Sequence, residues 1–118
     1  MDNKTPPIDI RFELKEFNND TEFLQKLLDD FFEQMEKRIS NMEKAVLAND
    51  YKIIKTEAHA IKGGAANLSA SALSETALDI ELFSKAEDME KSTAGIKKIK
   101  NEFTKLKNYV ADHKSLKF

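Results

Sequence analysis

Four stretches of this chain repeat apolar residues at steps of three and four, and this spacing limits its possible folds more than any other feature. Such steps gather side chains on one face of an α-helix, whereas a half-buried strand would alternate. The stretches lie at about residues 24–46, 51–68, 73–83 and 96–110. The first and longest consists of Leu24, Leu28, Phe31, Met35, Ile39, Met42 and Val46. The pattern predicts an all-α protein.

Each of the four predicted helices has one apolar face, so none is stable alone and the faces must pack together. With short connections, such helices favour an antiparallel up-down four-helix bundle. A short extra helix is expected within residues 9–17. Polar residues with side-chain acceptors predict where the long helices begin. The candidate caps are Asn19 with Glu22, Asn49-Asp50, and Ser69 or Ser71.

The length of 118 residues suits one compact domain. Pro6 and Pro7, the only prolines in the chain, cannot continue a helix backwards. We therefore expect a flexible tail or linker at residues 1–8, the bundle at residues 9–113 and a C-terminal tail at residues 114–118.

The composition argues against several classes of protein. Charged residues make up 34% of the chain, and no apolar run approaches the roughly 20 residues that span a bilayer. The N-terminus lacks the apolar stretch of a signal peptide, so we expect a cytoplasmic protein that does not bind membranes. The net charge of −2 gives no general attraction to nucleic acid. Without cysteine or a glycine-rich phosphate loop, no metal, nucleotide or other cofactor of its own is expected.

One segment, AHAIKGGAA at residues 58–66, breaks the local rules for a helix. Two of the three glycines in the chain, Gly63 and Gly64, stand side by side within it. Each costs about 1 kcal/mol relative to alanine in a helix interior. Such a violation suggests that another group must come close to the backbone there.

The side chains of this segment can be placed around the helix. At about 100° per residue, Gly63 and Ala66 fall within about 40° of His59. Lys55 lies equally close and Lys62 within about 60°, while the apolar stripe points away, so His59 should face solvent. A neutral imidazole is a nucleophile, and an ammonium group can offset phosphoryl charge. The arrangement therefore suits phosphoryl transfer at a contact between two proteins.

The run AHAIKGGA at residues 58–65 resembles the signature of histidine-phosphotransfer (HPt) domains, including the phosphohistidine domain of the chemotaxis kinase. The likeness continues through Leu73 and Glu75 to Glu81, and the whole resemblance covers about residues 9–110. It implies a phosphorelay carrier, which takes a phosphoryl group from an aspartate of one receiver domain and passes it to another. The receiver would supply Mg²⁺ and most catalytic groups, so the domain would resemble a substrate more than an enzyme.

The resemblance also implies roles for individual residues. His59 would carry the phosphoryl group and Lys62 would steady it. Glu81 would accept a hydrogen bond from Nδ1–H of His59 and leave Nε2 free to attack. The residues expected to contact a docked receiver are Gly63, Gly64, Lys55, Ala66 and Phe32.

Two positions depart from the family pattern. Ser69 stands where many members have glycine after the phosphohistidine helix, which affects the turn and not the chemistry. Leu78 replaces the second histidine of the chemotaxis domain, so that hydrogen-bond relay is absent. The expected partners are receiver domains and, as a further candidate, a histidine kinase, and the domain is expected to be a monomer.

The second histidine, His113, is interpreted as a favourable charge near a helix C-terminus. Neither histidine follows a glutamate by three residues, which disfavours the iron sites of some helical bundles. Two other functions stay open at this point. The domain could be the phosphoacceptor module of a larger histidine kinase, or a bundle that only binds a partner. A His59→Gln variant would separate them, since a pure binder keeps its function and a carrier loses it.

Overall fold

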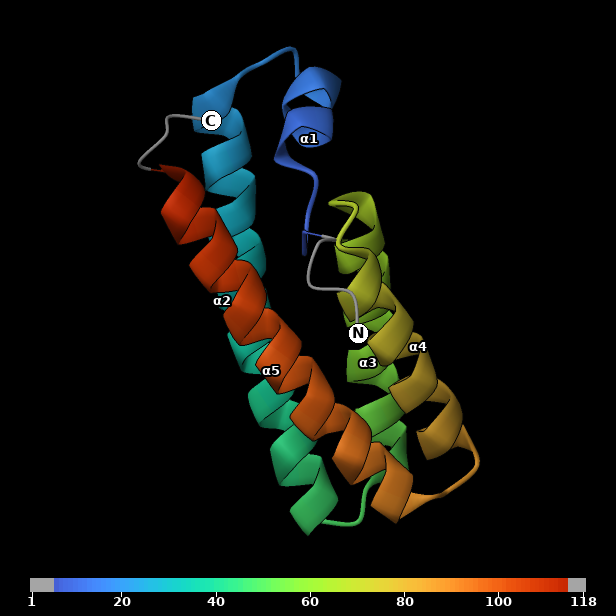
Figure 1. Cartoon of the computed structure of the whole chain (residues 1–118). Coiled ribbons are helices and arrows are strands. Elements are labelled where there is room, and N and C mark those ends of the chain that lie inside the picture. The colour runs from blue at the N-terminus through green and yellow to red at the C-terminus, as the bar shows by residue number, and fades with distance from the viewer. Residues whose placement is uncertain (1–5, 115–118) are drawn as a thin grey trace.

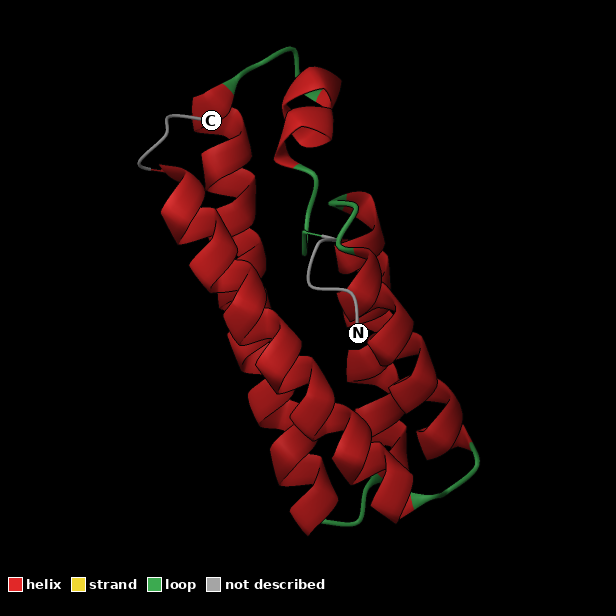
Figure 2. Cartoon of the chain, viewed as in Figure 1, coloured by secondary structure: helices red, strands yellow, loops and turns green. Residues whose placement is uncertain are grey.

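The computed structural model describes residues 6–114, without the side chains of Ile10, Arg11, Leu14, His113 and Lys114. These residues form one short helix and four long ones, and they contain no strand (Figure 1, Figure 2). The helices are α1 (Ile10–Glu16), α2 (Thr21–Leu47), α3 (Tyr51–Asn67), α4 (Ser71–Lys85) and α5 (Met89–Lys114). The prediction of an all-α protein is confirmed.

The four long helices run alternately up and down (Figure 1). Each packs against the next in the chain, and α5 returns to contact α2, so the bundle closes. The predicted antiparallel four-helix bundle is therefore confirmed, and the short extra helix is α1. None of the helices in residues 6–114 combines the length and apolar character that crossing a membrane requires.

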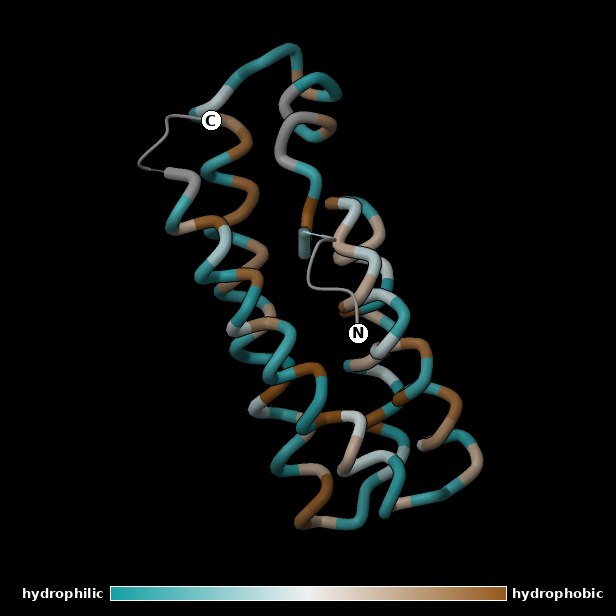
Figure 3. Tube along the Cα trace, viewed as in Figure 1, coloured by the Kyte–Doolittle hydropathy of each residue, from teal (hydrophilic) through white to brown (hydrophobic). Residues whose placement is uncertain are grey.

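The apolar stripes form the core of the bundle. Along each long helix, hydrophobic residues recur between hydrophilic ones, as expected for helices with one buried face (Figure 3). In α2 the predicted stripe supplies the buried residues Leu24, Leu28, Met35, Ile39 and Met42, with Phe31 and Val46 half-buried against the core.

Aspartates begin three of the long helices. Asp20, Asp50 and Asp88 each accept a hydrogen bond from the backbone N–H three residues later, at 2.9, 3.1 and 3.0 Å. These bonds satisfy N–H groups that have no partner within the helix. The cap predicted at Asn49-Asp50 is confirmed. The cap predicted at Asn19 is wrong, because Asn19 has a left-handed backbone with φ of 60° and Asp20 takes the cap position.

The serine cap predicted for α4 is also wrong. Ala70 is the cap residue, and no side chain bonds there. Ser69 has φ of 56°, and the N–H of Ala70 bonds back to the carbonyl of Ala65 at 2.8 Å. This is a left-handed closing turn of α3, so Ser69 ends one helix instead of beginning the next. Asn49 and Glu87 hold the same position after α2 and α4, with φ of 55° and 56°.

The predicted N-terminal tail is shorter than expected. Ile8 is 1% exposed and belongs to the core. The reason is the length of the helices: α2 and α5 have 27 and 26 residues, whereas α3 and α4 have 17 and 15. The short pair leaves one end of the bundle open, and α1 with the residues before it lies there (Figure 1). Residues 1–5 and 115–118 of the predicted tails lie outside the described residues.

Candidate functional site

His59 lies on the exposed face of α3, with 66% of its side chain accessible to solvent. Its Nδ1 is 3.0 Å from Oε2 of Glu81 on α4. An ionised carboxylate can only accept a hydrogen bond, so Nδ1 must carry the proton that is shared. In the neutral ring the lone pair is then at Nε2, on the other edge of an exposed imidazole.

Glu81 receives a second hydrogen bond, from Nζ of Lys62 to Oε1 at 2.9 Å. This bond is the largest influence on the carboxyl group and lowers its pKa. Partial burial is the second largest influence and raises the pKa of Glu81. The hydrogen bond from His59 lowers this pKa further, so the net shift is downward. Glu81 is therefore ionised at neutral pH and links two side chains of α3 to α4.

The position of Glu81 depends on the packing of α4. The preceding residue, Ile80, is fully buried. A Cβ atom built at Gly95 of α5 would be only 2.7 Å from Cγ1 of Ile80, so α4 and α5 approach closely at this point. On the other side of α4, Oγ of Ser74 donates to the carbonyl of Lys62 at 3.1 Å. Packing against α5 and hydrogen bonding to α3 together fix the level at which Glu81 meets His59.

The two adjacent glycines have different surroundings. A Cβ atom at Gly63 would meet nothing within 4 Å, so this position borders open space on the exposed face. A Cβ atom at Gly64 would lie 3.3 Å from the ring of Phe31 on α2, which makes Gly64 a contact between helices. Lys55 and Ala66 are exposed like Gly63. The exposed strip of α3 thus consists of Lys55, His59, Gly63 and Ala66, and its side chains are small on the C-terminal side of His59.

Beside this face, α2 and α3 enclose a groove of about 410 Å³. The sequence interpretation did not identify it as a groove, although Phe23 and Leu27 stand four residues apart and continue to Phe31 as a second apolar row on α2. Its apolar lining includes Phe17, Phe23, Leu27, Phe31, Ala60 and Gly64. Phe23 is 46% exposed, which is unusual for a large apolar side chain.

Phe32, one of the residues expected to contact a receiver, lies outside this groove. Its ring packs edge-on against Phe103 of α5, with 5.9 Å between ring centroids. Adjacent residues on a helix point about 100° apart, so Phe31 faces α3 while Phe32 faces α5. The structure thus places Phe31, and not Phe32, in the groove.

Other candidates contribute no second site in the described part of the chain. Across residues 6–114, no three histidine, aspartate and glutamate side chains are grouped so as to hold a metal ion. The side chain of His113 lies outside the described residues, although its backbone belongs to α5.

Comparison with known proteins gives two matches. A family model for the Hpt domain matches residues 26–109. Among solved structures, the chain is similar to the crystal structure of histidine-containing phosphotransfer protein B (HptB) from Pseudomonas aeruginosa PAO1. The TM-score is 0.83 at 22% sequence identity, covering 95% of this chain and 98% of that chain. At this identity the likeness concerns the fold. No curated protein matches the chain.

Proposed function

The chain belongs to the Hpt domain family and is thus a phosphotransfer carrier, and we propose that His59 accepts a phosphoryl group from a receiver-domain aspartate and passes it to another receiver. The observation that supports this most is the pairing of Nδ1 of an exposed imidazole with Glu81, which in the neutral ring leaves the lone pair on the accessible Nε2. A neutral imidazole in that tautomer is ready to attack phosphorus without first losing a proton.

The proposed step conserves atoms and charge. The lone pair of His59 Nε2 forms the N–P bond while the P–O bond of the aspartyl phosphate breaks and the receiver recovers its carboxylate. The ring retains the proton on Nδ1 and becomes positively charged. Glu81, already bonded to that proton at 3.0 Å, stabilises the charge. In the onward step a carboxylate oxygen of a second receiver attacks phosphorus, the N–P bond breaks with its electron pair returning to Nε2, and the neutral ring is restored.

Lys62 is proposed to offset the charge of the transferred group. Its Nζ donates to Glu81, and its side chain is 31% exposed, so it lies at the edge of the site and not inside the bundle. An ammonium group has three donors, and one of them can stay on Glu81 while another reaches a phosphoryl oxygen on Nε2. The Mg²⁺ ion and the remaining catalytic groups would come from the receiver, as in other phosphoryl transfers where positioning dominates.

The groove between α2 and α3 is proposed to hold an apolar part of the receiver. It lies on the same side of α3 as Ala60 and Gly64, next to the strip that carries His59. The open position at Gly63 allows the receiver backbone to approach while its aspartate reaches Nε2.

The test is transfer from receiver domains that carry radioactive phosphate. The chain should become labelled, and the label should be lost in acid and kept in base, as a phosphohistidine requires. His59→Gln should abolish labelling, whereas the matched variant His113→Gln should keep it. Labelling that survives in His59→Gln, or a chain that binds receivers and never becomes labelled, would refute the proposal.

A further inference from the structure

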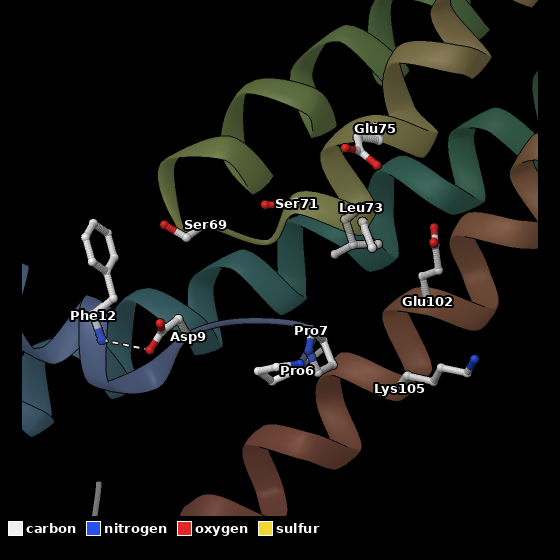
Figure 4. A pocket seen from close by; sticks show the side chains of 11 residues that line it. Pro6, Pro7, Asp9, Phe12, Ser69, Ser71, Leu73, Glu75, Glu102 and Lys105 are labelled. Carbon is white, nitrogen blue, oxygen red and sulfur yellow. Dashed lines mark hydrogen bonds between the residues drawn. The ribbon is translucent and has the colours of Figure 1, made fainter. Parts of the chain in front are cut away.

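The short helix α1 is packed less completely than the rest of the molecule. On one side it leads into Phe17, which lines the groove and packs edge-on against Phe23, with 5.2 Å between ring centroids. On its other side lies a cavity of about 810 Å³. It is bordered by residues 6–12, by the first turns of α4 and by Glu102 and Lys105 of α5 (Figure 4). A helix of seven residues that borders a cavity has few contacts to hold it in place.

One of those contacts is a buried carboxyl group. Glu13 is 2% exposed, in the middle of α1. Its Oε2 accepts a hydrogen bond of 3.3 Å from Oγ of Ser69, in the turn between α3 and α4. Burying an ionised carboxylate whose partner is only a neutral hydroxyl costs much free energy. Burying the neutral carboxylic acid costs much less. Docking of α1 therefore favours the protonated form of Glu13.

The two charged groups that act on the carboxyl group of Glu13, which are Glu16 and Asp9, work in the same direction. Burial is the main cause that raises the pKa of Glu13, and the carboxylates of Glu16 and Asp9 raise it further, against the hydrogen bond from Ser69. On neighbouring elements, α2 contributes Asp30 and Arg38 to the groove side, and α4 and α5 contribute Glu75, Glu102 and Lys105 to the cavity side. In the described part of the chain, no cation appears among the groups that act on this carboxyl.

We propose that residues 6–17 form a releasable wall of the docking groove, held against the bundle while Glu13 carries a proton and loosened when it is ionised. The inference rests on the proposed function for its consequence, because the wall contributes Phe17 to the surface on which a receiver would dock. Proton release at a residue remote from His59 would then weaken receiver binding.

The direction follows from the sign of the shift. The pKa of Glu13 is raised in the docked form above the ordinary value of 4.5. The stabilisation of the docked wall is thus complete below that ordinary value and is lost as pH rises through the raised pKa. A receiver that contacts Phe17 should bind more tightly at low pH than at high pH.

The first experiment follows the wall in the full chain without any partner. Amide NMR signals of Phe17 and Ser69 are recorded between pH 4 and pH 8 in the wild type, Glu13→Gln and the control Glu16→Gln. The two signals should share one transition in the wild type and in the control, and Glu13→Gln should lack it. Ser69→Ala, which removes a bond that lowers the pKa of Glu13, should move the transition to higher pH. Signals that do not titrate, or a transition unchanged in Glu13→Gln, would overturn the proposal.

The second experiment measures binding of a receiver domain by calorimetry in a His59→Gln background, which removes the titration of His59. At pH 8, adding Glu13→Gln should lower Kd about threefold or more, and this difference should shrink as pH falls toward the ordinary value of 4.5. Equal Kd values at pH 8 would refute the role of the wall in docking. Phosphate labelling of His59 decides the proposed function separately, since a chain can be labelled whether or not Glu13 titrates.

Discussion

Glu81 of α4 holds Nδ1 of His59 at 3.0 Å with one oxygen and Nζ of Lys62 at 2.9 Å with the other. A single carboxylate therefore positions both the proposed nucleophile and the ammonium group proposed to offset phosphoryl charge. Because the two residues sit on α3 and the carboxylate on α4, the geometry of the site depends on the alignment of these helices.

Replacing Glu81 with glutamine should slow phosphoryl transfer to His59 by about tenfold or more. The amide still offers an acceptor, but it carries no charge to stabilise the positive ring or to select one tautomer. The initial rate of labelling by a phosphorylated receiver measures this effect. Glu75→Gln, an exposed change on the same helix, should leave the rate unchanged, and equal rates in both variants would contradict the role of Glu81.

Acid should loosen the link between α3 and α4. The pKa of Glu81 is lowered in the folded protein, so its contribution to stability is present above the ordinary value of 4.5 and is lost as pH falls through the lower folded value. The difference in free energy of unfolding between wild type and Glu81→Gln should be constant above about pH 5.5 and should shrink toward about pH 3. Urea unfolding at several pH values measures it, and a difference that grows in acid would contradict the assignment.

The two glycines of the site should respond differently to alanine. Gly63→Ala should raise the free energy of unfolding by up to about 1 kcal/mol, because alanine favours helix and the position is open. It should also slow transfer, since the added methyl group faces the docking receiver. Gly64→Ala should stabilise less, because its methyl group would press on Phe31 at 3.3 Å. Urea unfolding and labelling rates measure both effects, and an unchanged rate in Gly63→Ala would refute close approach there.

Glu87→Gly should stabilise the fold by about 1 kcal/mol. Glu87 ends α4 with φ of 56°, where a side chain is strained and glycine is not. Glu87→Ala is the matched control, because it removes the same charge and keeps a Cβ atom. Thermal unfolding of the two variants should therefore differ, and equal melting temperatures would mean that the turn carries no strain.

Much of the fold could be predicted because the core is periodic. The row from Leu24 to Met42 specifies which face of α2 is buried, and the same logic places His59 on the outside of α3. The position of Glu81 beside the buried Ile80 follows in the same way, at the edge of the inner face of α4.

Features that depend on neighbouring elements could not be predicted from periodicity. Phe31 belongs to the predicted stripe of α2 and Phe32 borders it, and only the positions of α3 and α5 decide which of them lines the groove. Ser69 is a good cap in isolation, but the tight closing turn of α3 requires that residue in a left-handed conformation. The burial of Ile8 depends on the unequal lengths of the helices, which the stripes define only approximately.

The contact between Gly95 and Ile80 gives α5 an influence on a reaction in which it has no reacting group. Any side chain at position 95 would have to displace Ile80, whose neighbour in the chain is the carboxylate that orients the imidazole. The close approach of α5 to α4 at Gly95 therefore helps to set the position of Glu81 relative to His59. A substitution of Gly95, which lies outside the proposed docking surface, is therefore expected to change the rate of phosphoryl transfer while leaving receiver binding intact.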